Sequence, residues 1–312
     1  MISLPGEIAL PDTTDRAKTP SPPSGLAWAS LSVAIFSGWF VVTRLGLSQN
    51  LQVWDVIALR FGEGALFLTP TLLIGTSRLP LRAWPTGIPL AVLWGAPFIF
   101  FVGTGLRLTS AVLASSIAPA LMPIFAGVFV WISRGQCPRW IEISGYALIM
   151  AGLVLLVWCS VPAEGQMNTM GILSLIVAAA MWGFYTLRLK ASGLSPLQAT
   201  ALICFWSTVL YLPIYFGAGL SNLSRASAGE LLFQSTYQGF LMSVVAVLAF
   251  NRAVATLGPR ASSAIVALVP VAVVLFAIPV LNEFPSLIAL ASICGIAFGV
   301  MLTAAPEKPE RY

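Results

Sequence analysis

Ten apolar stretches, each about as long as a bilayer is thick, dominate the sequence. A helix needs about 20 largely apolar residues to cross the hydrocarbon core of a membrane. Stretches of that length recur from one polar or Pro/Gly break to the next. The predicted spans are residues 26–46, 54–76, 85–106, 110–133, 140–160, 171–190, 196–217, 230–255, 261–281 and 286–305. The pattern therefore predicts an all-α polytopic membrane protein with ten transmembrane helices.

The composition supports lipid as the main solvent for this surface. Of the 312 residues, 58% are hydrophobic and 9% are charged, against about 25% charged in ordinary soluble domains. Residues 1–25 combine charges with a Pro/Ser cluster and contain no apolar stretch that could act as a cleaved signal. We therefore expect residues 1–25 to be a disordered cytoplasmic tail, the first helix to be retained, and residues 306–312 to form a second cytoplasmic tail.

The distribution of Lys and Arg predicts the orientation of the chain. With a cytoplasmic N-terminus, twelve of these residues fall on inside segments, whereas only Arg44, Arg107 and Arg225 fall at outside ends. This asymmetry obeys the positive-inside rule, so we expect both termini to be cytoplasmic and the membrane to be a bacterial inner (plasma) membrane. The net charge of +5 is then a consequence of topology. Without a contiguous basic face, we expect no nucleic-acid partner.

The sequence shows no machinery for chemical catalysis. It contains no His, and its four cysteines, Cys137, Cys159, Cys204 and Cys294, lie far apart. His is the commonest general base and metal ligand, and no nucleotide-binding or nucleophile motif interrupts the apolar runs. We therefore expect no enzyme activity, no cofactor and no metal site.

An internal repeat sets the predicted architecture. Residues 114–123 align without gaps to residues 261–270 and match at six of ten positions. Further similar pairs recur at offsets of 143 to 150 residues. We interpret residues 26–160 and residues 171–305 as two five-helix repeats. Because five is odd, the second repeat enters the membrane in the opposite orientation, which predicts an inverted repeat of the kind that supports alternating access.

Short motifs in this order resemble the drug/metabolite transporter superfamily with two EamA-type halves, over residues 26–305. The residues that carry the resemblance are Gly38-Trp39, Ala58-Leu59-Arg60-Phe61, the small-residue run into Pro123, its copy into Pro270, and Asn282-Glu283. The family often has an acidic residue after helix 4, where this chain has Arg134-Gly135-Gln136. The resemblance implies export of amino acids, metabolites or cationic drugs, and the sequence is similar to the aromatic and neutral amino-acid exporter branch.

The resemblance also implies that helices 1, 3, 4, 6, 8 and 9 surround a central cavity, so we sought unusual residues near the middle of these spans. Trp is unusual at that depth because it favours membrane interfaces, and its ring offers a flat surface to apolar or cationic ligands. The alternatives are that these residues face lipid, pack between helices or form interhelical hydrogen bonds. The candidate cavity residues are Trp39, Trp94, Phe98, Phe101, Trp182, Tyr185, Gln238, Met242 and Ser243.

Three prolines lie inside predicted helices 4 and 9, at Pro119, Pro123 and Pro270. Each removes one backbone hydrogen bond and can bend its helix. These residues are candidate hinges, and passive kinks are the alternative.

Charges within the predicted spans are few. Arg60 and Glu63 lie three residues apart and so share one face of helix 2. Each alone costs roughly 2.5–3.5 kcal/mol at a helix centre on insertion scales, which favours an ion pair between them. The alternative is that Glu63 couples transport to protons. Asp55 and Glu283 fall near the outer helix ends, where we expect them to be solvated.

The sequence favours an exporter of small metabolites, chiefly neutral or aromatic amino acids and also cationic drugs, that works by alternating access around a midplane cavity. A small-molecule substrate and membrane lipid are the expected partners, and a monomer is one option for the oligomeric state. A proton-coupled antiporter of the same fold is one alternative. A membrane scaffold that transports nothing is the other.

Overall fold

The computed structural model describes residues 22–75, 77–160, 168–257 and 260–304, and this part of the chain consists of helices and their connections, without strands. The elements of the first half are α1 (Pro22–Ser48), α2 (Val53–Leu73), the 3-10 turn η1 (Leu81–Thr86), α3 (Gly87–Trp94), α4 (Ala96–Leu108), α5 (Ala111–Arg134) and α6 (Trp140–Cys159). The second half contains α7 (Thr169–Ser192), α8 (Pro196–Gly217), the 3-10 turn η2 (Leu223–Arg225), α9 (Ala228–Ser235), the π-helix η3 (Thr236–Val245), α10 (Ala246–Leu257), α11 (Arg260–Leu281) and α12 (Leu287–Thr303).

The predicted all-α membrane class is confirmed. Eight helical stretches of the described chain are long and apolar enough to cross a membrane, and the stretches Ile265–Leu281 and Leu287–Thr303 are apolar but shorter. At about 1.5 Å of rise per residue, the seventeen residues of α12 cover nearly the thickness of the hydrocarbon core, at the short end of the usual range. Together these helices account for the ten expected spans.

Two predicted boundaries need correction. Residues 22–25 were expected in a disordered tail, but α1 already begins at Pro22, since proline suits the first turn of a helix. The rest of both predicted tails lies outside the described residues. The third span, expected as one helix over residues 85–106, is divided at Gly95, where the backbone leaves the helical region (φ −93°, ψ −138°). Pro97 follows in the first turn of α4, and a proline ring there cannot continue the helix that precedes it.

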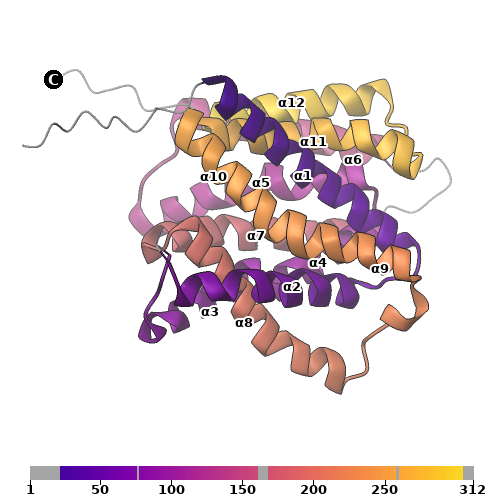
Figure 1. Ribbon diagram of the computed structural model, residues 1–312. Coiled ribbons are helices and arrows are strands. Elements are labelled where there is room, and N and C mark those ends of the chain that lie inside the picture. The colour runs from indigo at the N-terminus through magenta and orange to yellow at the C-terminus, as the bar shows by residue number, and fades with distance from the viewer. Residues whose placement is uncertain (1–21, 76, 161–167, 258–259, 305–312) are drawn as a thin grey trace, which may run out of the picture.

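The packing of the helices repeats between the two halves. Helix α1 packs against α10 and α11, and its counterpart α7 packs against α4 and α5. Counterparts α2 and α8 contact each other, as do α6 and α12. Figure 1 shows α6, α11 and α12 together on one side of the bundle and α2, α3 and α8 on the other. Exchanging each span with its counterpart leaves these contacts unchanged, which is the pattern of a pseudo-two-fold relation between two five-helix repeats.

Small residues bring α6 and α12 into backbone contact. A Cβ atom added at Gly145 would lie 2.8 Å from the carbonyl oxygen of Gly299, and one added at Gly299 would lie 3.0 Å from that of Gly145. Membrane helices associate through such close packing because lipid offers no hydrophobic drive between them. This crossing fixes the last span of each half against the other.

Candidate functional site

A buried side-chain amide joins α1 to the eighth span. The indole Nε1 of Trp39 donates a hydrogen bond of 2.7 Å to Oε1 of Gln238, and Nε2 of Gln238 donates to Thr43 Oγ1 over 2.9 Å. Gln234 extends the network, since it accepts from Gln238 over 3.3 Å and donates to the Val42 carbonyl over 2.8 Å. We call Trp39, Thr43, Gln234, Gln238 and the adjacent Arg60 the polar cluster. Two of its members, Trp39 and Gln238, are predicted cavity residues.

The π-helix explains how the eighth span supplies this network. Gln238 and Ser243 both lie in η3, where the wider turn changes which side chains share a face. The hydroxyl of Ser243 is buried and lies 3.3 Å from the Gln238 carbonyl oxygen and 3.4 Å from that of Arg60. Ser243 therefore links the π-helix to α2 at the level of the polar cluster, and π-turns within helices occur frequently at functional sites.

The predicted ion pair between Arg60 and Glu63 is not formed. The Arg60 guanidinium carbon lies 5.2 Å from the centre of the Trp39 ring, whereas the Glu63 carboxylate accepts a hydrogen bond from Ser235 on α9. The two side chains have different neighbours, because Arg60 reaches the Trp39 ring on α1, whereas Glu63 contacts the eighth span, against which α2 packs. The two charges therefore have separate environments.

Four predicted cavity residues form a second group, which we call the aromatic cluster: Trp94, Phe98, Trp182 and Tyr185. The ring of Trp94 stacks on Phe98 with centroids 4.1 Å apart and on Tyr185 with centroids 5.0 Å apart. Trp182 lies 4.6 Å from Trp94 and meets Phe98 edge to face at 6.1 Å. The third span and α7 thus meet through a continuous surface of rings.

The break in the third span holds this cluster in place. Trp94 ends α3 and Phe98 lies in the first turn of α4, on either side of Gly95. The amide of Ala96 donates to the Ser207 hydroxyl on α8 over 3.3 Å, and the side chain of Ser207 occupies the space where a Cβ of Gly95 would be. Discontinuous helices of this kind line substrate sites in other transporter folds.

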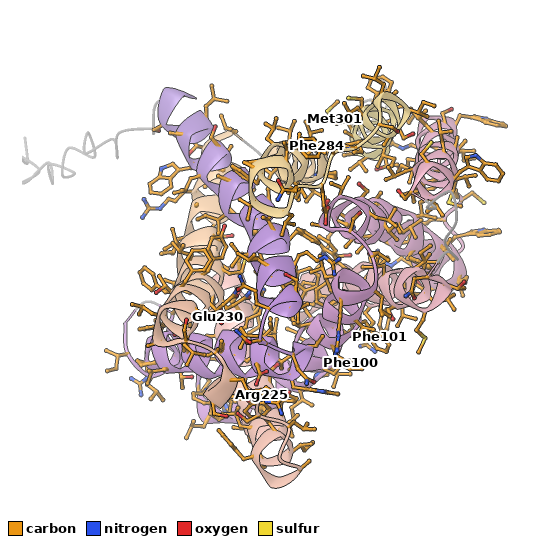
Figure 2. The ribbon with its side chains drawn as sticks, turned by 90° about the vertical axis from the view of Figure 1, so that its right-hand side faces the viewer. Phe100, Phe101, Arg225, Glu230, Phe284 and Met301 are labelled. Carbon is orange, nitrogen blue, oxygen red and sulfur yellow. The ribbon has the colours of Figure 1, made fainter. Side chains whose placement is uncertain are left out.

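The remaining candidates are Phe101, Met242 and the three prolines. Phe101 meets Phe100 edge to face, and Phe100 in turn stacks on Trp54; Figure 2 shows Phe100 and Phe101 together on α4. Met242 is half-buried against the hydrophobic core. Pro119 and Pro123 lie within α5 and Pro270 within α11, and both helices continue past them. Their role as hinges stays a prediction.

The expectation of a solvated carboxylate is wrong for Asp55, whereas Glu283 is partly exposed. Asp55 is fully buried and accepts hydrogen bonds from the Tyr215 hydroxyl (2.6 Å) and the Asn222 amide (2.9 Å). Glu283 accepts from the amides of Ala111 and Val112, at the N-terminus of α5, over 3.0 and 3.4 Å. Carboxylates in low-dielectric surroundings need such donors, and the sequence places these donors far from the acids along the chain.

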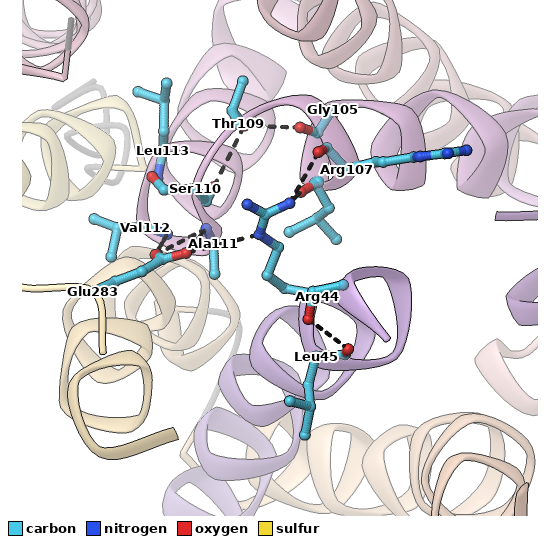
Figure 3. A network of polar contacts seen from close by, with 12 residues as sticks. Arg44, Leu45, Gly105, Arg107, Thr109, Ser110, Ala111, Val112, Leu113 and Glu283 are labelled. Atoms are coloured by element: carbon cyan, nitrogen blue, oxygen red, sulfur yellow. Dashed lines mark hydrogen bonds and ion pairs between the residues drawn. The ribbon is translucent and has the colours of Figure 1, made fainter. Parts of the chain in front are cut away.

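Arg44 completes a charge network at the same end of the bundle (Figure 3). Its Nε lies 3.8 Å from Glu283 Oε1, and its Nη1 donates to the carbonyls of Leu106 and Arg107 over 2.7 and 2.9 Å. The arginine thus meets the C-terminal carbonyls of α4 and the glutamate meets the N-terminal amides of α5. Both charges oppose the partial charges of those helix ends, so the network ties α1, α4, α5 and the end of α11 together.

Two residues of the polar cluster were not identified from the sequence. Thr43 follows Trp39 by four residues and Gln234 precedes Gln238 by four residues. Residues four apart share a helix face, so a search for polar neighbours of the candidate residues would have found both. The network of Arg44 and Glu283 gave no comparable local signal.

The chain is an integral membrane protein built from two five-helix repeats. The two halves pack about a pseudo-two-fold axis, and the polar and aromatic clusters lie between them. The chain belongs to the EamA-like transporter family, whose pattern matches residues 23–158 and again residues 169–305. It is similar to a protein of Streptantibioticus cattleyicolor described as "Probable terminal-alkyne amino-acid exporter", with 25% identity over 89% of this chain and 93% of that protein. A solved crystal structure of 19% identity shares the fold over 91% of this chain and 97% of its own, with a TM-score of 0.61.

Proposed function

We propose that this protein exports small amphipathic metabolites, chiefly neutral and aromatic amino acids, by alternating access around a cavity between its halves. The observation that carries the proposal is the different surroundings of two corresponding tryptophans. Trp39 on α1 is bonded to a buried amide of the eighth span, and Trp182 on α7 contacts rings of the third span. A molecule with a polar head and an apolar or aromatic side chain complements these two surfaces.

The relative from Streptantibioticus cattleyicolor, described as an amino-acid exporter, supports the same substrate class. Cationic drugs suit the proposed site less well than amino acids do. Aromatic faces attract cations, but Arg60 already lies over the Trp39 ring and repels a second positive charge there. A zwitterionic amino acid meets no such net repulsion.

Net export is the proposed direction, and the description of the relative as an exporter supports it. The excess of Lys and Arg on one side supports a cytoplasmic location for both termini, and the proposed membrane is a bacterial inner membrane. The end of the bundle that carries Arg44 and Glu283 then faces outward. Exchange of the conformations of the two halves would open the site to each side in turn.

The test is flux from proteoliposomes that contain only this protein and a panel of labelled amino acids. We expect saturable release of neutral and aromatic amino acids, and we expect Trp182→Ala to slow phenylalanine more than alanine. Trp158→Ala is the matched control, because the Trp158 side chain on α6 is 78% exposed and lies outside both clusters. The absence of flux for every amino acid in the panel would refute the substrate assignment.

Proton-coupled antiport is a second candidate, and one observation favours it. Glu63 is half-buried, unpaired with Arg60, and bonded to the Ser235 hydroxyl of the eighth span. Protonation of this carboxylate would change its contact with that span, which is the behaviour a coupling group requires. An imposed pH gradient should then accelerate flux in the parent protein and leave Glu63→Gln unaffected. Equal flux with and without the gradient would leave facilitative export.

A further inference from the structure

We infer that Arg60 binds the carboxylate of the transported molecule, with its guanidinium held in place by Trp39. This inference rests on the proposed function and narrows it, because it makes a carboxylate the required group of the substrate. The Arg60 side chain lies in the polar cluster and is 8% exposed. Its Nη1 is sealed from solvent and has no hydrogen-bond partner in the described part of the chain.

Each acidic residue that the structure describes is engaged elsewhere. Asp55 bonds to Tyr215 and Asn222, and Glu63 bonds to Ser235. The remaining three pair as Glu142 with Arg139, Glu230 with Asn50, and Glu283 with Arg44 and the start of α5. A buried cation without a partner is strongly unfavourable. Within the described chain, Arg60 is therefore a charge whose anion is missing.

The geometry around Arg60 suits a ligand better than a passive structural role. The guanidinium carbon lies 5.2 Å from the Trp39 ring centre and 5.8 Å from the Phe61 ring centre. Trp39 is itself fixed by its hydrogen bond to Gln238. Aromatic contact holds a guanidinium without using its N–H donors, so the donors stay free for a partner that arrives from outside the protein.

The chemistry of the donors favours a carboxylate. A guanidinium presents two parallel N–H groups that match the two oxygens of a carboxylate. Arg60 is the only cation of the polar cluster, so it balances one negative charge and would leave a doubly charged phosphate uncompensated. A carboxylate on Arg60 also places the rest of an amino acid near Trp39 and Gln238, where the amide can orient further polar groups.

Competition by head-group analogues of phenylalanine tests the inference on the parent protein. Labelled phenylalanine is released from proteoliposomes while unlabelled phenylalanine, 3-phenylpropionate, phenethylamine or phenylalaninamide competes. We expect the two carboxylates to compete at least tenfold more strongly than the two compounds without a carboxylate. Strong competition by 3-phenylpropionate would extend the substrate class to carboxylic acids without an amine. Equal competition by phenethylamine and phenylalanine would overturn the inference without any variant.

Variants of Arg60 test whether this residue causes the preference for carboxylates. Arg60→Gln should weaken competition by the carboxylates at least tenfold and leave that by phenethylamine unchanged, whereas Arg60→Lys should retain part of the preference. Arg188→Gln is the matched control, because Arg188 also lies over a ring, that of Phe184, but is exposed and outside the polar cluster. An unchanged carboxylate preference in Arg60→Gln would exclude Arg60 as the binding residue.

A binding measurement separates this inference from the proposed function. If the parent protein releases no amino acid, export of amino acids fails, but 3-phenylpropionate should still raise the unfolding temperature of the purified protein. Phenethylamine should not, and the effect should vanish in Arg60→Gln. If neither carboxylate stabilises the parent protein or competes for flux, the carboxylate site fails as well.

Discussion

Among single residues, Gln238 joins the two halves through hydrogen bonds of its side-chain amide. Its amide bonds to Trp39 and Thr43, so Gln238→Leu leaves a buried indole N–H without an acceptor. We expect this substitution to lower the free energy of unfolding by about 1–3 kcal/mol. Trp39→Phe, which removes the donor, should lower it too, and the double variant should lose less than the sum by about 1 kcal/mol. Unfolding in detergent measures the cycle, and strict additivity would contradict the contact.

Asp55 provides a second test at the level of one residue. Its carboxylate accepts from the Gln52 amide, the Asn222 amide and the Tyr215 hydroxyl, and it forms no ion pair with another described residue. Hydrogen bonds to charged groups are worth about 1.5–3 kcal/mol. We expect Asp55→Ala to destabilise the protein by more than that amount, and Tyr215→Phe, which removes one donor, by less. A fully stable Asp55→Ala would show that solvent reaches this position.

Among the elements, the crossing of α6 and α12 is sensitive to added volume. In Gly299→Ala the new methyl group would lie 2.8 Å from a side-chain carbon of Ile149 and 3.0 Å from the Gly145 carbonyl. Because one of these neighbours is backbone, the helices must separate, and we expect a loss of about 1–3 kcal/mol in unfolding free energy. Gly62→Ala is the control, since its nearest neighbour is a Leu212 carbon at 4.0 Å. Destabilisation in both would indicate a general intolerance of helix glycines.

The helices also show which features of the fold can be predicted from the sequence. Apolar length predicts the ten spans because it reports directly on contact with lipid, and the repeat predicts their division into two halves. The break at Gly95 and the π-helix around Gln238 depend on Ser207 and on α2, which lie far away along the chain. The error at Arg60 has the same origin: a spacing of three residues places Glu63 on its face, but Ser235 and Trp39, from other helices, decide where each charge points.

For the whole molecule, the pseudo-two-fold relation makes the two ends of the bundle comparable. Asn282-Glu283 follows α11, and Arg134-Gly135-Gln136 stands in the corresponding place after α5. The carboxylate that ties the end of α11 to the start of α5 therefore has no acidic counterpart in the other half. Under alternating access, the end with Arg44 and Glu283 must open when the opposite end closes. The energy needed to open the two ends should then differ.

Loss of this carboxylate should favour the state that is open at the end of Arg44 and Glu283. Glu283→Gln removes the ion pair with Arg44 and weakens the acceptor at the start of α5. An interaction of 0.3–1 kcal/mol at a helix end corresponds to a roughly two- to fivefold larger open population. The reporter is Leu113→Cys, in the first turn of α5, where the native Leu113 is 5% exposed. The cysteine is labelled by a membrane-impermeant thiol reagent, and the rate is corrected for the native cysteines. Glu142→Gln is the control because it breaks the other ion pair, with Arg139, and should leave labelling unchanged. Equal labelling rates with and without Glu283 would mean that packing alone closes this end, and that the charge network only orients the helix termini.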